Sequence, residues 1–138
     1  MKLFTSLFLA TVLVGCATNP QVANIQAVAK QTFGSDTNLI IHEITPPQPQ
    51  LDQYGYNPSF SDLDLRYDLL LGETQNVDLV VWGTSSAEAK FKILGALHAT
   101  QAHRLPHLRL LFVGAPQDAE RIRLTVEARG AQFYFHQK

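Results

Sequence analysis

Apolar residues recur along the chain with two periods, one typical of helices and the other of strands. Steps of three and four residues, with capping signals at the starts and glycines after two of the ends, predict three helices. These helices cover residues 20–33, 85–102 and 116–129. Short apolar runs predict strands over residues 39–44, 77–82, 108–113 and 131–136.

Residues 63–71 alternate between apolar and polar side chains almost without exception. One side would carry Leu63, Leu65, Tyr67, Leu69 and Leu71, and the other Asp64, Arg66 and Asp68. Because a period of two is the repeat of a strand, this segment is predicted to be a strand with one buried face. The short GETQN turn that follows predicts an antiparallel hairpin with strand 77–82.

These elements predict a single α/β domain. The last three strands, linked by two helices, should be parallel with right-handed crossovers. Since strand 63–71 would leave one sheet face to solvent, we expect a two-layer sandwich. Its mixed sheet would have about four to five strands, with helices mainly on one face. The domain would span residues 20–138 and include a proline-rich loop at residues 45–62.

The N-terminal segment has the composition of a targeting signal. A basic residue precedes an apolar stretch over residues 3–14, which is too short to span a bilayer. The stretch ends in Leu13-Val14-Gly15-Cys16, which resembles the lipobox of bacterial lipoproteins. The resemblance implies that residues 1–15 are a signal peptide that is removed. Cys16 would then be acylated, and residues 16–19 would form a lipidated tether.

Lipidation has consequences for localisation and partners. A triacylated Cys16 would hold the protein firmly in a membrane. Ala17 follows the cysteine, which in the sorting habit of enteric-type lipoproteins implies the outer membrane, facing the periplasm, rather than the inner membrane. A formal net charge of −1 argues against nucleic acid as a partner. We therefore expect two partners, membrane lipid through Cys16 and another envelope protein.

Charge is distributed unevenly along the chain. Residues 36–78 contain eight acidic residues and one basic residue, whereas residues 88–138 contain four acidic and eight basic residues. The two halves could lie side by side and neutralise each other. Alternatively, they could present a surface of two signs that orients a partner.

Two turns could hold an anion. Gly83, Thr84, Ser85 and Ser86 lie between strand 77–82 and the next helix, and Gly114 follows strand 108–113 at the equivalent end. Free backbone N–H groups and the helix dipole favour anions at such positions. One glycine per turn is a weak motif, however, and the two serines also fit the role of helix caps.

One face of the predicted sheet has the composition of a protein interface. It mixes aromatic, aliphatic and charged side chains, as the cores of interfaces do. The candidate residues are Arg66, Asp68, Trp82, Arg109, Tyr134 and His136. Either this face docks a partner, or the first helix and the proline-rich loop cover it. The last strand could also be an edge strand, open to the addition of another strand.

The remaining candidate chemistry matches no standard motif. His98, His103 and His107 have no recognised zinc spacing, and the chain contains no G-x-S-x-G elbow. We therefore expect a protein that is not an enzyme and has no cofactor or metal. By analogy of size and layout, it would be an assembly module of a secretion, conjugation or pilus complex.

Two alternative functions stay open. One is a lipoprotein that binds peptidoglycan or a small anion. The alternation of strands and helices is loosely similar to OmpA-like domains, and Arg121, Arg123 and Arg129 would supply cations, although the N-x-x-L-S-x-x-R-A pattern of those domains is absent. The other is an envelope hydrolase.

Overall fold

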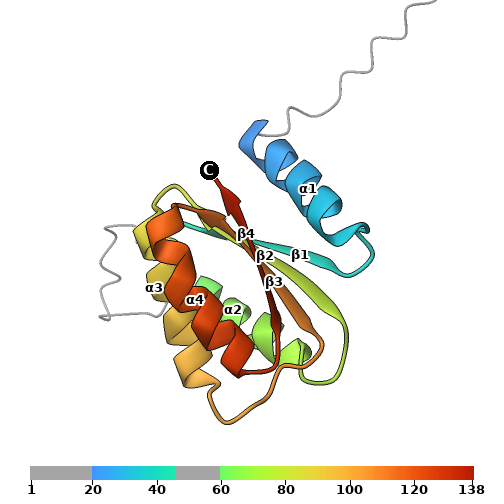
Figure 1. Ribbon diagram of the computed structural model, residues 1–138, viewed down its shortest axis with the longest axis vertical. Coiled ribbons are helices and arrows are strands. Elements are labelled where there is room, and N and C mark those ends of the chain that lie inside the picture. Colours follow the sequence, from blue (N-terminus) through green and yellow to red (C-terminus); the bar gives the residue numbers. More distant parts are fainter. Residues whose placement is uncertain (1–19, 46–59) are drawn as a thin grey trace, which may run out of the picture.

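The protein forms an α/β fold in which helices and strands alternate (Figure 1). The computed structural model describes residues 20–45 and 60–138, so the predicted lipobox, the tether and most of the proline-rich loop lie outside the described residues. The helices are α1 (Pro20–Phe33), α2 (Phe60–Leu71), α3 (Ser86–Ala99) and α4 (Pro116–Ala128). The strands are β1 (Leu39–Ile44), β2 (Val77–Gly83), β3 (Leu108–Gly114) and β4 (Gln132–Gln137).

The sheet of the described residues is parallel throughout. Its four strands follow the chain in the order β1-β2-β3-β4, so each strand pairs with the next one along the sequence. Leu39 aligns with Asp78, Val77 with Leu108, and Arg109 with Gln132. The prediction of a mixed sheet is therefore wrong, because a helix separates each pair of neighbouring strands.

The prediction of a strand over residues 63–71 is wrong, and with it the antiparallel hairpin. This segment belongs to α2, in which Leu65 and Leu69 lie one turn apart and are both buried. Leu63 and Tyr67 point away from the sheet and are 51% and 65% exposed. The apolar residues that alternate in the sequence are thus divided between the core and the solvent.

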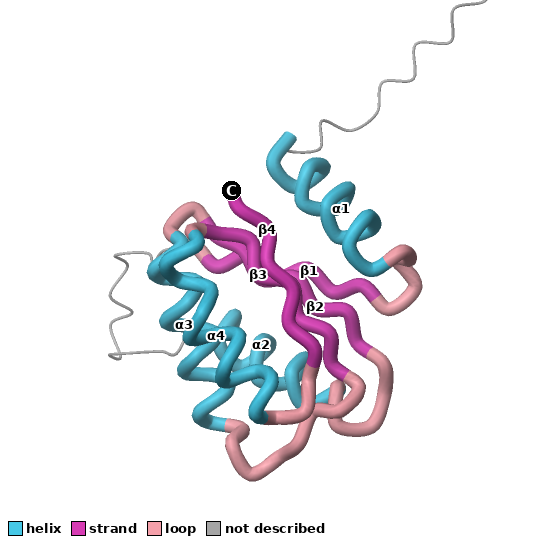
Figure 2. The backbone as a smooth tube through the Cα atoms, in the orientation of Figure 1, coloured by secondary structure: helices cyan, strands magenta, loops and turns pink. Residues whose placement is uncertain are grey.

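Helices lie on both faces of the sheet. Figures 1 and 2 show α2, α3 and α4 together on one side and α1 alone on the other. The prediction that helices lie mainly on one face holds for three of the four, but the fold has a third layer. Because both faces are covered, every residue of β2 is buried, as is typical of central parallel strands.

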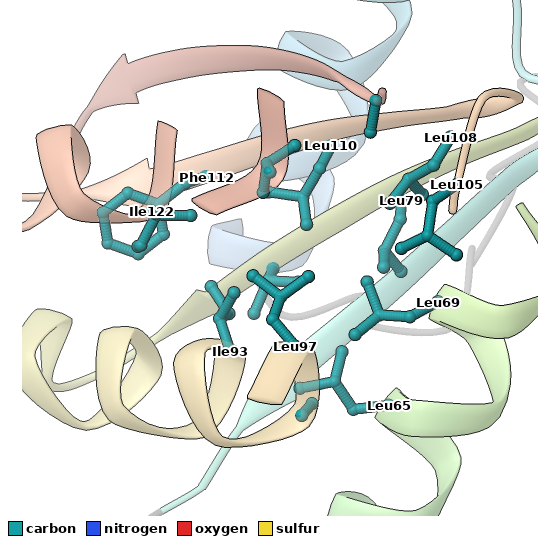
Figure 3. Close-up of a cluster of buried hydrophobic side chains, with 14 of the residues drawn as sticks. Leu65, Leu69, Leu79, Ile93, Leu97, Leu105, Leu108, Leu110, Phe112 and Ile122 are labelled. Atoms are coloured by element: carbon teal, nitrogen blue, oxygen red, sulfur yellow. The ribbon is translucent and has the colours of Figure 1, made fainter. Parts of the chain in front are cut away.

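The larger core lies between the sheet and the three helices. Figure 3 shows Leu65 and Leu69 of α2 and Ile93 and Leu97 of α3 pointing toward the sheet, where Leu79, Leu110 and Phe112 meet them. All of these side chains are at most 1% exposed. The smaller core on the opposite face is formed by α1. Among the described residues, no helix has the length and apolar character needed to cross a membrane.

Candidate functional site

The predicted partner face is largely covered by α1. Three buried residues of this helix pack on four buried residues of the central strands. The helix contributes Ile25, Ala29 and Phe33, and the strands contribute Val80, Trp82, Leu111 and Val113. Trp82 is only 1% exposed, so it is a core residue. Of the two alternatives for this face, the described residues favour coverage by the first helix.

Two members of the predicted face lie elsewhere. Arg66 and Asp68 belong to α2, on the opposite side of the sheet, because their segment is helical. Arg66 is exposed, whereas Asp68 is partly buried against β1 and hydrogen-bonded to Nε2 of His42. The placement of these two residues on the partner face is therefore wrong.

Arg109 connects β2, β3 and α1. Its Nε and Nη2 atoms donate to the two carboxylate oxygens of Asp78 at 2.6 and 2.7 Å, and Asp78 is only 3% exposed. The guanidinium also lies over the ring of Phe33, 4.9 Å from its centroid. The hydrogen bonds to Asp78 raise the pKa of Arg109 above its ordinary value. The arrangement holds α1 against the sheet, which is a structural role.

An ion pair and a hydrogen bond join the acidic and basic halves of the chain. Asp78 contacts Arg109, and Oε2 of Glu73 lies 2.9 Å from Nδ1 of His103. Both contacts bring the two halves side by side, and the ion pair between Asp78 and Arg109 agrees with the alternative in which the halves neutralise each other.

Tyr134 and His136 lie on β4, which is an edge strand as the sequence suggested. The ring of Tyr134 packs edge-on against Phe33, with centroids 5.6 Å apart, and is half-buried. His136 is exposed. On the other face of the strand, Phe135 stacks on Phe112 and is still 38% exposed. Of the predicted face residues that lie on the sheet, His136 is exposed, Tyr134 and Arg109 are half-buried, and Trp82 is buried.

The five residues of the predicted anion site meet at the carboxyl edge of the sheet. Ser85 is the N-cap of α3 and accepts a hydrogen bond from the backbone N–H of Glu88 at 3.2 Å. Ser86 donates to Oδ2 of Asp118 at 2.7 Å and accepts from the N–H of Ala115 at 2.8 Å. Both serines are therefore engaged within the fold.

Glycine is needed at this edge because the segments approach closely. A Cβ on Gly114 would lie 2.6 Å from Oγ of Ser86, and one on Gly83 would lie 2.7 Å from the carbonyl oxygen of Ile44. Close packing therefore explains why both positions are glycine, without any need for a ligand.

A carboxylate already occupies the edge where the anion was expected. Asp118 is 6% exposed, and Nζ of Lys90 lies 3.1 Å from its Oδ1. The hydrogen bond from Ser86, followed by the contact with Lys90, lowers the pKa of Asp118 below its ordinary value despite burial. Ser86 and Lys90 are therefore already engaged by this carboxylate, and an added anion would have to compete with Asp118 for both groups.

Replacing Asp118 with asparagine should lower the free energy of unfolding at neutral pH by about 1–2 kcal/mol. The pKa of Asp118 in the folded protein lies below the value of about 3.9 in the unfolded chain. Ionised Asp118 therefore stabilises the fold fully above the unfolded pKa. This stabilisation is lost as the pH falls through the folded pKa. The free energy of unfolding, measured with urea between about pH 6 and pH 2, should therefore depend less on pH in the Asp118→Asn variant than in the parent chain. Glu127→Gln, at an exposed ion pair, is the control and should change little. Equal pH dependence in Asp118→Asn and the parent chain would contradict the assignment.

An open groove lies between α1 and the edge strand β1. It has a volume of about 580 Å³ and is lined by Gln26, Ala27, Lys30, Asp36, Leu39 and Ile41. Leu39 and Ile41 are half-buried, and Lys30 and Asp36 carry opposite charges. Sequence reasoning missed this site because it depends on where α1 docks across the sheet. The alternation of Leu39 and Ile41 on one side of the strand was the only available signal.

The three histidines considered for zinc lie in different parts of the fold. His98 lines the groove between α3 and α4, whereas His107 lies at the amino edge of the sheet, and His103 contacts Glu73. Within the described ranges, no group of three or more His, Cys, Asp and Glu side chains is arranged to hold a metal ion.

No protein-family model matches the chain, and comparisons with curated proteins and with solved structures give no match.

Proposed function

We propose that the protein is a non-enzymatic lipoprotein of the outer membrane, facing the periplasm, that docks on another envelope protein as part of a secretion, conjugation or pilus type of complex. The lipobox-like Leu13-Val14-Gly15-Cys16 supports the anchor. The groove between α1 and β1 supports docking, and it is the observation that carries the proposal.

The groove has the features of a site for an extended protein segment. Its floor includes the half-buried Leu39 and Ile41 of β1, which in the described sheet pairs only with β2. An added strand could hydrogen-bond to the free edge of β1 while its side chains contact this floor. Lys30 and Asp36 would bind side chains of opposite charge at the rim. The partner is therefore a protein with an amphipathic segment that can extend.

The tether would keep this groove near the bilayer. Residues 17–19 lie between the acylated Cys16 and Pro20, the first residue of α1. The four steps along the chain from Cys16 to Pro20 reach at most roughly 14 Å, at about 3.5 Å each. A partner that meets the groove would therefore lie in or beside the same membrane.

Cells grown with radiolabelled palmitate should incorporate the label into the parent chain but not into a Cys16→Ser variant. The reason is that the acyl chains are attached through this thiol, and Cys16 is the only cysteine in the sequence. Immunoprecipitation and autoradiography measure the label. An unlabelled parent chain would remove the membrane anchor from the proposal.

Blocking the groove should remove the partner. Gln26 and Gln31 are both exposed on α1, but only Gln26 lines the groove. Gln26→Trp fills the space with an indole, whereas Gln31→Trp adds the same side chain elsewhere on the helix. After reversible crosslinking in cells, the partner that copurifies with the parent chain should also copurify with Gln31→Trp. Its recovery with Gln26→Trp should be at least about tenfold lower, which corresponds to a loss of about 1.4 kcal/mol of binding free energy. Equal recovery with both variants would contradict docking at the groove.

A pull-down with purified peptidoglycan separates this proposal from the cell-wall alternative. A docking module should remain in the supernatant at physiological salt, whereas a wall binder would sediment with the sacculi. Binding to the sacculi that survives Gln26→Trp would replace the docking proposal with wall binding at another surface.

A further inference from the structure

The edge strand β4 lacks the features that usually protect sheet edges from pairing. Native edge strands commonly carry proline, charged residues or bulges. The six residues of β4, QFYFHQ, contain no proline and no Asp, Glu, Lys or Arg. They pair with β3 in an unbroken register from Arg109–Gln132 to Gly114–Gln137. In the part of the chain that the structure describes, no strand pairs with the outer side of β4.

The register with β3 identifies which backbone groups of β4 point outward. The N–H of Lys138 donates to the carbonyl oxygen of Gly114 at 3.1 Å, so Lys138 turns its backbone groups toward β3. Alternate residues of a strand direct their N–H and C=O groups to opposite sides. Phe133, Phe135 and Gln137 therefore present their backbone groups to the open edge, spaced evenly about Phe135.

We propose that two copies of the chain pair through β4, antiparallel, about a two-fold axis at Phe135. Phe135 then lies opposite its own equivalent, and Phe133 of each copy lies opposite Gln137 of the other. Every outward backbone group of the strand finds a partner in this register, and both copies use the same surface, as a two-fold interface requires. The two sheets become one continuous sheet.

The side chains of β4 are complementary to themselves in this register. On the face toward α4, the two Phe135 rings, each 38% exposed, meet across the axis and are buried together. On the face toward α1, Tyr134 lies opposite His136 of the second copy. Lys138 lies opposite Gln132, so no like charges oppose each other. Because the strand carries no charge that would select a different partner, a second copy is the occupant that its chemistry fits best.

Self-pairing is independent of the proposed docking function. It uses β4, at the opposite edge of the sheet from β1 and the groove. Copies joined in this way would present two grooves, and failure of either proposal would leave the other standing.

A charge swap at the axis tests the symmetry directly. The full chain carrying Cys16→Ser, purified in mild detergent, should sediment as a monomer–dimer equilibrium. Phe135→Glu and Phe135→Lys should each raise the dimer dissociation constant by about tenfold or more, because like charges then face each other. An equimolar mixture of the two variants should restore the dimer, since glutamate then faces lysine. Phe91→Glu removes a phenylalanine that is 73% exposed on α3 and should leave the equilibrium unchanged.

A cysteine at the axis gives a second readout. Opposed residues of a hydrogen-bonded antiparallel pair have Cα atoms about 5.5 Å apart, within the range of a disulfide. Phe135→Cys, in the Cys16→Ser background, should form a disulfide dimer on mild oxidation, whereas Phe91→Cys should not. A parent chain that stays monomeric at all concentrations, a dimer that survives Phe135→Glu, or equal crosslinking from positions 91 and 135 would overturn the proposal. A monomer that gains a strand from a different protein at β4 would also overturn it.

Discussion

Replacing Arg129 with alanine should lower the free energy of unfolding by about 3 kcal/mol. The guanidinium is buried, and burial lowers its pKa. It donates to the carbonyl oxygens of His103 at 2.5 Å and Leu97 at 2.7 Å, and also to that of Thr100. Leu97 and Thr100 lie at the end of α3, where carbonyl groups have no further turn of helix to bind, and His103 lies in the loop that follows. The alanine variant would remove the donors of all three hydrogen bonds, two of which are buried.

Two further variants separate the causes of this loss. Arg129→Met keeps most of the apolar stem but no donor, so it should be nearly as destabilised as Arg129→Ala. Arg129→Lys keeps the charge but cannot reach three carbonyl groups with one ammonium, so its stability should be intermediate. Thermal unfolding should show a decrease in Tm of roughly 10 °C for the alanine variant. A methionine variant as stable as the parent chain would show that packing, rather than hydrogen bonding, explains the role of Arg129.

Replacing Arg109 with glutamate should lower the free energy of unfolding by about 2–3 kcal/mol. This is less than the cost of breaking a fully buried ion pair, because the Arg109 side chain is 35% exposed and solvent screens its charge. The Asp78 side chain is 5% exposed, so the variant would leave its carboxylate buried and beside a second one. The contact with the Phe33 ring would also be lost, which should loosen α1. Urea unfolding at neutral pH measures the effect.

A double variant tests whether the Arg109–Asp78 contact itself is responsible. Asp78→Asn combined with Arg109→Gln removes both charges and lets the two amides hydrogen-bond, so it should recover most of the lost stability. If Arg109→Glu is as stable as the parent chain, the residue contributes little to the fold, and an interfacial role for Arg109 becomes tenable again.

Most elements of the fold could be predicted from local patterns. The helices α1, α3 and α4 and all four strands of the described sheet lie close to their predicted ranges, because their periodicity, caps and β-branched or aromatic content agree. The S-x-x-E capping box of α3 is an example, since Ser85 does accept from the N–H of Glu88. Where several local signals agree, the sequence is a reliable guide.

One segment determined the predicted topology. The odd-numbered positions from 63 to 71 are apolar, but positions 65 and 69 are also one helical turn apart. The segment contains no valine, isoleucine or threonine and is rich in leucine, a composition that favours a helix. The leucine-rich composition could therefore have identified this segment as a helix despite its alternating apolar residues. A helix between β1 and β2 makes their connection a crossover, and the sheet becomes parallel.

The candidate site was harder to predict because it depends on tertiary placement. Arg109 and Trp82 were assigned to the correct face of the sheet, but their exposure depends on α1, which packs over them. No local sequence pattern predicts which face of the sheet the first helix covers. The groove beside α1 and the ion pair between Asp78 and Arg109 follow from that placement, so both required the structure.

Site-specific photo-crosslinking in intact cells tests the docking proposal most directly. A benzophenone amino acid at position 26 places the reactive group in the groove, whereas the same amino acid at position 31 places it on α1 outside the groove. We expect one defined adduct with an envelope protein from position 26, which is absent from position 31 and is lost when Cys16 is replaced by serine. Adducts of equal yield from both positions, or none from position 26, would contradict the docking proposal.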